Sequence, residues 1–278
     1  MQELSDYEKQ QIQAIDAWKS EEPSVVSHAF GSVVEPIVWL VQKVVPDSAI
    51  QGAIEGASAL GQYLTDTKDI LRDAQVENIA DLRSGELALC DKLADEVHNW
   101  AIGVAMAEGS ATGALGIFGA PVDVPAIITI AMRTIHKIGV CYGYESKTSE
   151  DGQFALGILG ASGANTVREK LAALATLTAL RTVLARQSWK VMAEHAAQNQ
   201  FGKEAVLVTI RNLGKQIGIN VTKRRAMAAI PAIGAVVGGS VNGWYIKEVG
   251  WAARRAFQER WLVNSGKVPI PASSASRD

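Results

Sequence analysis

The sequence lacks the residues on which several classes of protein depend. Its two cysteines, Cys90 and Cys141, stand alone and far apart, so we expect neither a disulfide framework nor a cysteine-based metal site. Its 27 lysines and arginines face 29 aspartates and glutamates, which gives no electrostatic reason to expect nucleic acid as a partner. The opening residues, MQELSDYEKQQ, lack the apolar centre of a signal peptide, so the sequence predicts a cytoplasmic protein.

The motifs of well-known catalytic sites are also missing. No G-x-S-x-G run is present to hold a hydrolase serine on a sharp turn, and no G-x-x-x-x-G-K-[ST] run is present to bind phosphates. The four histidines are scattered without metal-ligand spacing: His28, His98, His136 and His195. We therefore expect no metal and no cofactor, and the sequence favours a protein that is not an enzyme.

Helical periodicity dominates the sequence. Ser5 and Glu8 have the spacing of a capping box that opens a first helix, and residues 86–108 carry apolar residues at helical spacing. Residues 66–84 form the most polar interior stretch, which we expect to be a solvated connector with a short helix. Because no alternating strand pattern persists, we predict an all-α, multi-helix bundle. It forms a single domain, residues 1–262, followed by a disordered polar tail, residues 263–278.

Two long segments are rich in glycine and almost free of charge. Residues 109–132 have Asp123 as their only charged residue, and residues 226–246 have none. Glycines at this spacing let helix backbones approach closely, and the predicted helix-packing positions are Gly109, Gly113, Gly116, Gly119, Gly234, Gly238, Gly239 and Gly243. Prolines interrupt both segments, and Asp123 followed by Pro125 has the pattern of a helix start. We predict two broken helical hairpins and a separate final helix over residues 242–262.

Polar residues in apolar surroundings are the candidates for a functional site. A buried carboxylate or amide must be hydrogen-bonded, and such residues concentrate at functional sites. The interpretation that the sequence favours is structural, with Asp123 capping its helix and Asn242 bonding a nearby backbone group. The functional alternative is a small-molecule-binding or hydrolytic enzyme with a pocket around Asp123, Tyr142 and Asn242, which are weak catalytic candidates. That alternative requires the three side chains to converge in one cleft.

Three ordered blocks of the sequence resemble the EcsC protein family. The residues that carry the resemblance are Leu4, Ser5, Asp6, Tyr7, Glu8 and Trp18 in the first block, Gly113, Gly116, Gly119, Asp123, Pro125, Arg133, Tyr142, Gly143, Tyr144 and Glu145 in the second, and Ile230 to Ala235, Gly238, Gly239, Asn242, Ala253, Phe257 and Arg260 in the third. The similarity covers about residues 3–262. It implies a helical, membrane-associated protein of undetermined biochemical activity, in a family named for a component encoded beside an ABC transporter. The resemblance supplies no catalytic residues.

The glycine-rich segments raise the question of a membrane. Basic and aromatic residues flank the second segment, and the predicted lipid contacts are Lys223, Arg224, Arg225, Trp244 and Tyr245. That segment is mostly alanine and glycine, and Asp123 would be costly in the middle of the first, which disfavours a full span. We rank peripheral or shallow association with the inner face of the cell membrane first, a fully soluble helical interaction module second and a two-span protein third. The expected partner is a membrane lipid or membrane protein, and the glycine-rich helices also allow self-association.

Overall fold

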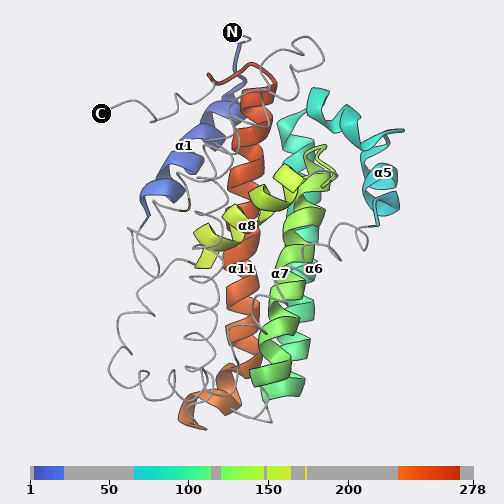
Figure 1. Ribbon diagram of the computed structural model, residues 1–278. Coiled ribbons are helices and arrows are strands. Elements are labelled where there is room, and N and C mark those ends of the chain that lie inside the picture. The colour runs from blue at the N-terminus through green and yellow to red at the C-terminus, as the bar shows by residue number, and fades with distance from the viewer. Residues whose placement is uncertain are drawn as a thin grey trace.

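The described part of the chain is built of helices. The computed structural model describes residues 3–21, 66–113, 120–146, 149–163, 173 and 231–269. Its elements are α1 (Asp6–Ser20), α5 (Lys68–Ala74), the 3-10 helix η1 (Ile79–Ser84), α6 (Leu87–Gly113), α7 (Ala120–Cys141), α8 (Ser149–Gly163) and α11 (Pro231–Asn264) (Figure 1). Within these ranges there is no strand, which confirms the all-α prediction.

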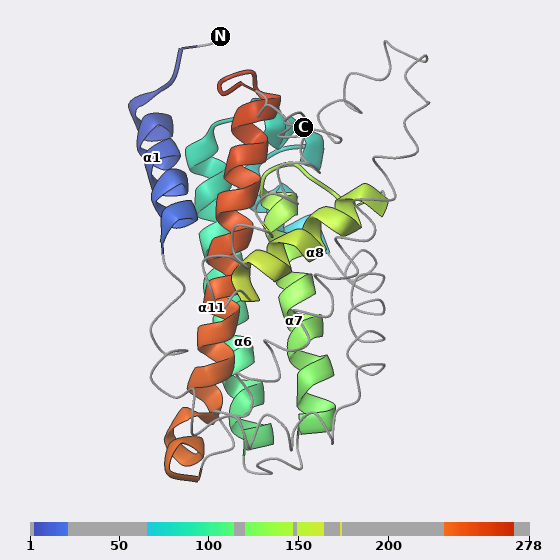
Figure 2. The same ribbon diagram turned by 60° about the vertical axis from the view of Figure 1, so that its left-hand side comes forward.

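Three long helices form the centre of the molecule. Helices α6, α7 and α11 run side by side, α8 crosses them, and α1 packs against the upper part of α11 (Figures 1 and 2). The apolar stripe of α7 explains this arrangement, because Ile128, Ile135 and Ile138 recur at helical spacing and are completely buried. Burying one such side chain contributes roughly 1.5–3 kcal/mol, so this stripe holds α7 firmly against its neighbours.

Two predicted helix boundaries were wrong. Helix α7 begins at Ala120, so Asp123 lies in its first turn and does not cap it. Helix α11 begins at Pro231 and continues without a break to Asn264, so the separate final helix predicted from residue 242 does not exist. Proline is well suited to a first helical position, because the N–H that it lacks would have no acceptor within the helix there. From residue 231 onward the second glycine segment is part of one helix. Residues 114–119 and 226–230 lie outside the described residues, so the two hairpins stay a prediction.

Close helix contacts do depend on glycine, although mostly at other positions than predicted. Gly243 of α11 lies against Met106 of α6, and Gly250 of α11 lies against the ring of His98, so a Cβ atom at either position would force the neighbouring side chain to move. At Gly139 of α7 a Cβ would come within 2.7 Å of the Phe257 ring. Of the predicted packing glycines, Gly243 alone has a described environment; Gly116 and Gly119 lie outside the described residues.

Left-handed turns end α7 and α11. Gly143 has a φ of +87°, and the Tyr144 N–H donates to the Gly139 carbonyl at 2.9 Å, which closes α7. Gly266 has a φ of +68° and plays the same part after α11, where the Lys267 N–H donates to the Leu262 carbonyl at 3.0 Å. Residues 263–269 therefore complete and cap α11, so the tail was predicted to begin too early.

The polar connector and the first helix both join the central bundle. Residues 66–84 contain the expected short helix, α5, but Ile79 and Leu82 of η1 are buried in the common core. The predicted capping box of α1 is confirmed, since the Ser5 side chain accepts from the Glu8 N–H and the Glu8 carboxylate accepts from the Ser5 N–H. The Glu8 carboxylate also pairs with Lys267 at 2.5 Å, which ties the two ends of the described structure together.

Candidate functional site

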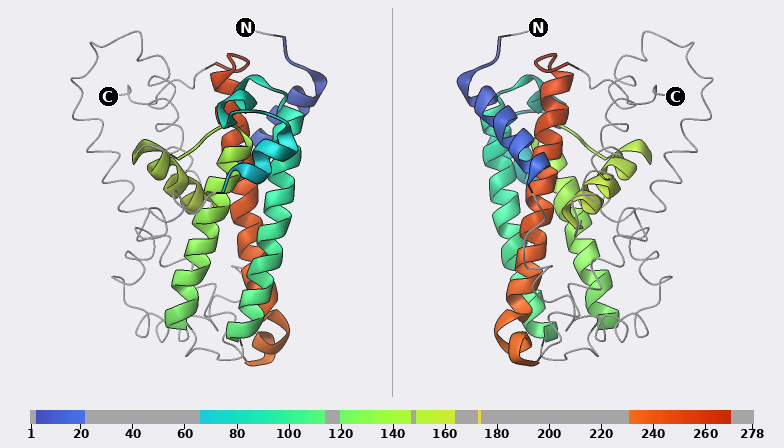
Figure 3. Two further views of the ribbon diagram at one scale, coloured as in Figure 1. Left: turned by 90° about the vertical axis from the view of Figure 1, so that its right-hand side faces the viewer. Right: turned by 90° about the vertical axis from the view of Figure 1, so that its left-hand side faces the viewer.

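One end of the central bundle is nearly free of charge. We call it the charge-poor end: residues 101–113 of α6, 120–132 of α7 and 231–246 of α11, which lie together at the bottom of the views in Figure 3. Within these three ranges the sequence has two charged residues, Glu108 and Asp123. An α-helix rises about 1.5 Å per residue, so each of these stretches extends for about 20 Å along its helix. The fold therefore gathers both glycine-rich segments at one end.

The exposed face of α6 changes character at the same level. In the first half of the helix its exposed side chains include Lys92, Asp95 and Glu96. Further along, the exposed positions are uncharged, with Trp100 63% exposed and Met106 45% exposed. A tryptophan at a boundary between polar and apolar surface is typical of proteins that meet a membrane interface.

The predicted lipid contacts differ in how far the structure exposes them. Trp244 is half-buried, and its position on α11 is close to the upper limit of the charge-poor end. Tyr245 is only 3% exposed and packs in the core, so its prediction as a lipid contact is wrong, because it faces the neighbouring helices. The basic cluster of residues 223–225 lies outside the described residues. Among the helices that the structure describes, none combines the length and the hydropathy needed to cross a membrane.

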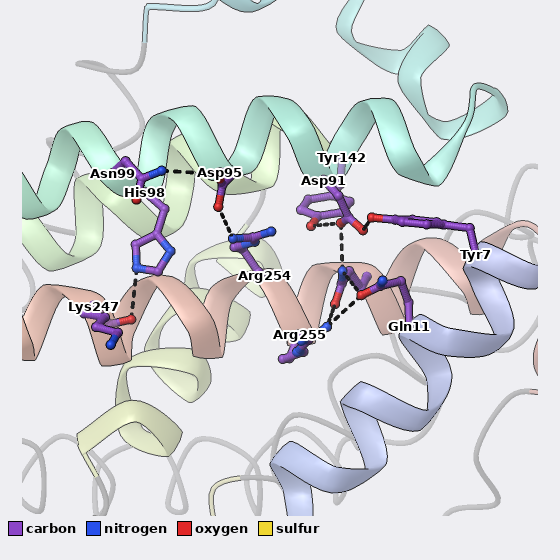
Figure 4. Close-up of polar contacts among 11 residues, drawn as sticks. Tyr7, Gln11, Asp91, Asp95, His98, Asn99, Tyr142, Lys247, Arg254 and Arg255 are labelled. Atoms are coloured by element: carbon purple, nitrogen blue, oxygen red, sulfur yellow. Dashed lines mark hydrogen bonds and ion pairs between the residues drawn. The ribbon is translucent and has the colours of Figure 1, made fainter.

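A buried network of polar side chains lies at the opposite end of the bundle, around Asp91. The carboxylate is 4% exposed and accepts hydrogen bonds from the Tyr7 hydroxyl at 2.6 Å, the Tyr142 hydroxyl at 2.5 Å and the Gln258 amide at 2.8 Å (Figure 4). Tyr7 belongs to α1, Tyr142 to the turn after α7, and Gln258 to α11. The Asp91 side chain of α6 therefore joins four parts of the fold. Gln11 extends the network by accepting from Arg255 at 3.0 Å.

The electrostatics of the Asp91 network keep both tyrosine hydroxyls protonated, which suits a structural role. Burial, together with the neighbouring Asp91 carboxylate, raises the pKa of Tyr142 well above its ordinary value. Burial and the hydrogen bond to Asp91 raise the pKa of Tyr7 in the same way. A tyrosine with a raised pKa holds its proton at neutral pH and stays a donor, so neither hydroxyl is suited to act as a base. The network can therefore fix helix positions but has no group ready for proton transfer.

A row of contacts between α6 and α11 continues from this network (Figure 4). Arg254 donates to Asp95 at 2.6 Å and lies over the Trp251 ring, 4.5 Å from its centroid. One turn further along, the His98 Nε2 is 3.0 Å from the Lys247 carbonyl oxygen, and its ring meets Trp251 edge-on. These contacts set the register of the two longest helices against each other.

The burial of Asp91 and His98 was not predicted, although the sequence contains a pattern that indicates it. Both lie on the stripe of α6 that includes the buried residues Leu87, Ala94 and Ala101. Positions 87, 91, 94, 98 and 101 repeat at alternating spacings of four and three, which is the core pattern of a packed helix. A polar residue at such a position is buried and needs a partner, and the pattern could have indicated both.

The predicted pocket around Asp123, Tyr142 and Asn242 does not form. Asp123 is in the first turn of α7 and Tyr142 follows its last residue, so about 28 Å of helix separates them. Asn242 lies on α11 four turns before Gln258, which contacts Asp91 beside Tyr142. It is 1% exposed, and its Nδ2 has no hydrogen-bond partner among the described residues. The three residues cannot share a cleft, and the enzyme alternative loses the site on which it rested.

A serine–histidine pair was also absent from the predictions. The Ser146 Oγ lies 2.5 Å from the His136 Nδ1, a geometry that an activated serine would need. His136 is 2% exposed, however, and its Nε2 has no hydrogen-bond partner among the described residues. The nearby carboxylate of Asp151 is paired with Arg260 at 3.0 Å, so no acidic group in the described part of the chain orients the imidazole. This arrangement has the nucleophile and the base but lacks the third group.

The two buried histidines predict a dependence of stability on pH. Burial lowers the pKa of both His98 and His136 to about 4, whereas an unfolded histidine titrates near 6.5. Below pH 6.5 the unfolded chain therefore binds more protons than the folded protein. The stability that the two neutral histidines contribute is complete above that pH and is lost as pH falls toward 4. Urea unfolding between pH 7.5 and 4.5 should show a decline of up to a few kcal/mol. His136→Gln should flatten the slope, and a wild-type stability that is constant from pH 7 to 5 would contradict the prediction.

Comparison with known proteins agrees with the resemblance seen in the sequence. The profile of the EcsC protein family matches residues 9–262. An uncharacterised protein of Bacillus subtilis (strain 168), YdbA, is 24% identical over 210 residues, which cover 73% of this chain and 72% of that protein. No solved structure matches the chain.

Proposed function

This chain belongs to the EcsC family, and on that premise we propose that it is a non-enzymatic protein of the inner face of the cell membrane, which it meets with its charge-poor end. The partner is a lipid surface, and the end enters one leaflet only. The observation that carries the proposal is the meeting of α6, α7 and α11 at one end, with charge-poor stretches of similar depth.

The depth of the charge-poor end favours shallow insertion. Its stretches extend for about 20 Å along their helices, with Glu108 and Asp123 as their only charged residues, whereas the hydrocarbon core of a bilayer is about 30 Å thick. A depth of about 20 Å matches one leaflet together with part of its interface. Trp100 and Trp244 would then lie near the headgroups, where tryptophan side chains concentrate.

The opposite half of the molecule is suited to water. It carries the ion pairs between Lys137 and Asp69, Arg254 and Asp95, and Lys267 and Glu8. These charges would be expensive in lipid, which limits insertion to the other end. The basic residues 223–225 precede the charge-poor part of α11 by five residues in sequence, and we propose that they contact anionic headgroups.

The proposal predicts that a charge at the insertion level weakens membrane binding. Gly103 lies on the exposed face of α6, and a side chain there meets open space, so Gly103→Glu adds a charge without a steric clash. Wild-type protein should co-sediment with vesicles containing phosphatidylglycerol at low salt. The variant should bind at least about fivefold more weakly, because a carboxylate at this depth is costly to desolvate.

Two matched variants separate charge from size and position. Gly103→Gln has the same length without the charge and should bind like wild type. Ala88→Glu adds the same charge to an exposed position in the other half of α6 and should also have no effect. Recovery of the wild type in the supernatant at low salt, or equal binding by Gly103→Glu, would overturn the proposal.

A further inference from the structure

A cavity lies between α5, α6 and α7, next to the charge-poor end and apart from the Asp91 network. Its volume is about 370 Å³, within the range of about 300–1,000 Å³ that small-molecule sites occupy. Buried apolar side chains form its floor, among them Ile70, Leu93 and Ala101. Its lining also contains polar and aromatic residues, among them the exposed Glu96 and Trp100, so the cavity is amphipathic.

Negative charge predominates in the lining. It contains four carboxylates, those of Asp66, Asp69, Asp73 and Glu96, against two basic side chains, those of Arg133 and Lys137. Lys137 is already engaged, since it pairs with Asp69 at 2.5 Å and donates to the Asp66 carbonyl oxygen. Glu96 has no ion-pair partner among the described residues. A carboxylate that is free in this setting attracts a cation.

The ring of Trp100 is the second cation-binding element. Trp100 follows Glu96 by four residues on α6, so the two side chains are neighbours on one face of the helix. The ring is 63% exposed. Trp251 and Trp261 each carry a cation of the protein over their rings, whereas no described residue places one over Trp100. An exposed indole beside a free carboxylate is suited to an ammonium group.

We propose that this cavity binds an amphiphilic ammonium compound, with its cation between Glu96 and Trp100 and its apolar part on the floor beside Ile70 and Leu93. The shared chemistry is an ammonium group attached to an apolar chain, whether the compound is free in solution or is the headgroup of an amino lipid. The inference does not depend on insertion of the charge-poor end, because the cavity is open to water-borne ligands.

Calorimetric titration of the full-length protein with octyltrimethylammonium, below the concentration at which it forms micelles, tests the inference. Saturable binding is expected, with tetramethylammonium weaker because it lacks the chain, and octyl sulfate weaker because it has the wrong charge. Glu96→Gln and Trp100→Leu should each weaken binding about fivefold or more. Glu86→Gln, which removes an exposed carboxylate of similar type outside the cavity, should leave binding unchanged.

Two results would overturn the inference. If octyl sulfate binds as tightly as octyltrimethylammonium, the cavity takes any surfactant chain and does not select a cation. If Glu96→Gln binds like the wild type while its unfolding curve is unchanged, the cation does not lie at Glu96. Vesicles with and without an amine headgroup then identify the source of the ligand. Binding of the free compound by protein that ignores vesicles would support this site while disproving membrane docking.

Discussion

Gly250→Ala is expected to lower the free energy of unfolding by about 2–3 kcal/mol, the usual effect of overfilling a packed core. The added Cβ would occupy the space of the His98 ring, which is buried and held by the Lys247 carbonyl and by Trp251. The ring cannot move away without losing both contacts, so α6 and α11 must separate. Urea unfolding at pH 7.5, where both buried histidines are neutral, measures the effect.

Gly103→Ala is the matched control for this prediction. Gly103 is also in a long helix, but a Cβ there meets open space. Alanine is the better helix former by about 1 kcal/mol, so this variant should be slightly more stable than the wild type. In a His98→Ala background, which lacks the ring, Gly250→Ala should lower the free energy of unfolding by less than it does in the wild type. Equal stability of the two glycine variants would show that the α6–α11 contact is looser than described.

Asp91→Ala is expected to lower the free energy of unfolding by about 3 kcal/mol. The substitution removes the acceptor of the Tyr142 hydroxyl and the Gln258 amide, which are 0% and 1% exposed and cannot turn to water. A buried donor without an acceptor costs about 1–3 kcal/mol, so two of them account for the effect. Asp91→Asn should lie between the two proteins, because the amide keeps one acceptor oxygen. The measurement is again urea unfolding.

A double-mutant cycle tests whether the loss comes from the Asp91 network. Tyr7→Phe should cost about 1 kcal/mol in the wild type, where the hydroxyl donates to Asp91, and nothing measurable in Asp91→Ala. Asp95→Asn is the control on the same helix: its carboxylate pairs with Arg254 but is half exposed, so the loss should be below about 1 kcal/mol. Additive effects of Tyr7→Phe and Asp91→Ala would mean that the two residues act separately.

The sequence predicted features that depend on near neighbours in the chain. The capping box of Ser5 and Glu8 and the helical spacing of apolar residues over 86–108 are each specified within a few residues. Helix starts at Ala120 and Pro231 were misplaced because proline near a charge-poor run was interpreted as an interruption. In the structure Pro121 and Pro231 lie within the first turn of their helices, where a missing N–H has little cost, and α7 continues through Pro125.

The site residues could not be predicted in the same way, because they depend on contacts between distant parts of the chain. The role of Gly250 follows from His98, which lies 152 positions earlier and was one of four unremarkable histidines. Asp91 gains its partners from α1 and α11, at separations of 84 and 167 residues. The cavity beside Glu96 and Trp100 needs α5 and α7 in place, and no local pattern of α6 specifies it.

The attachment of α1 has a consequence for biosynthesis. Its polar partners on α11 and in the turn that follows include Gln258, Arg255 and Lys267, at sequence separations of 247, 244 and 259 residues. At about 5–20 residues per second, a ribosome needs roughly 10–50 s between completing α1 and completing α11. During that interval Ile15, which is 3% exposed in the folded protein, has no surface of α11 to cover it. The side of α1 that packs on α11 therefore stays uncovered until the last of the described helices has been made.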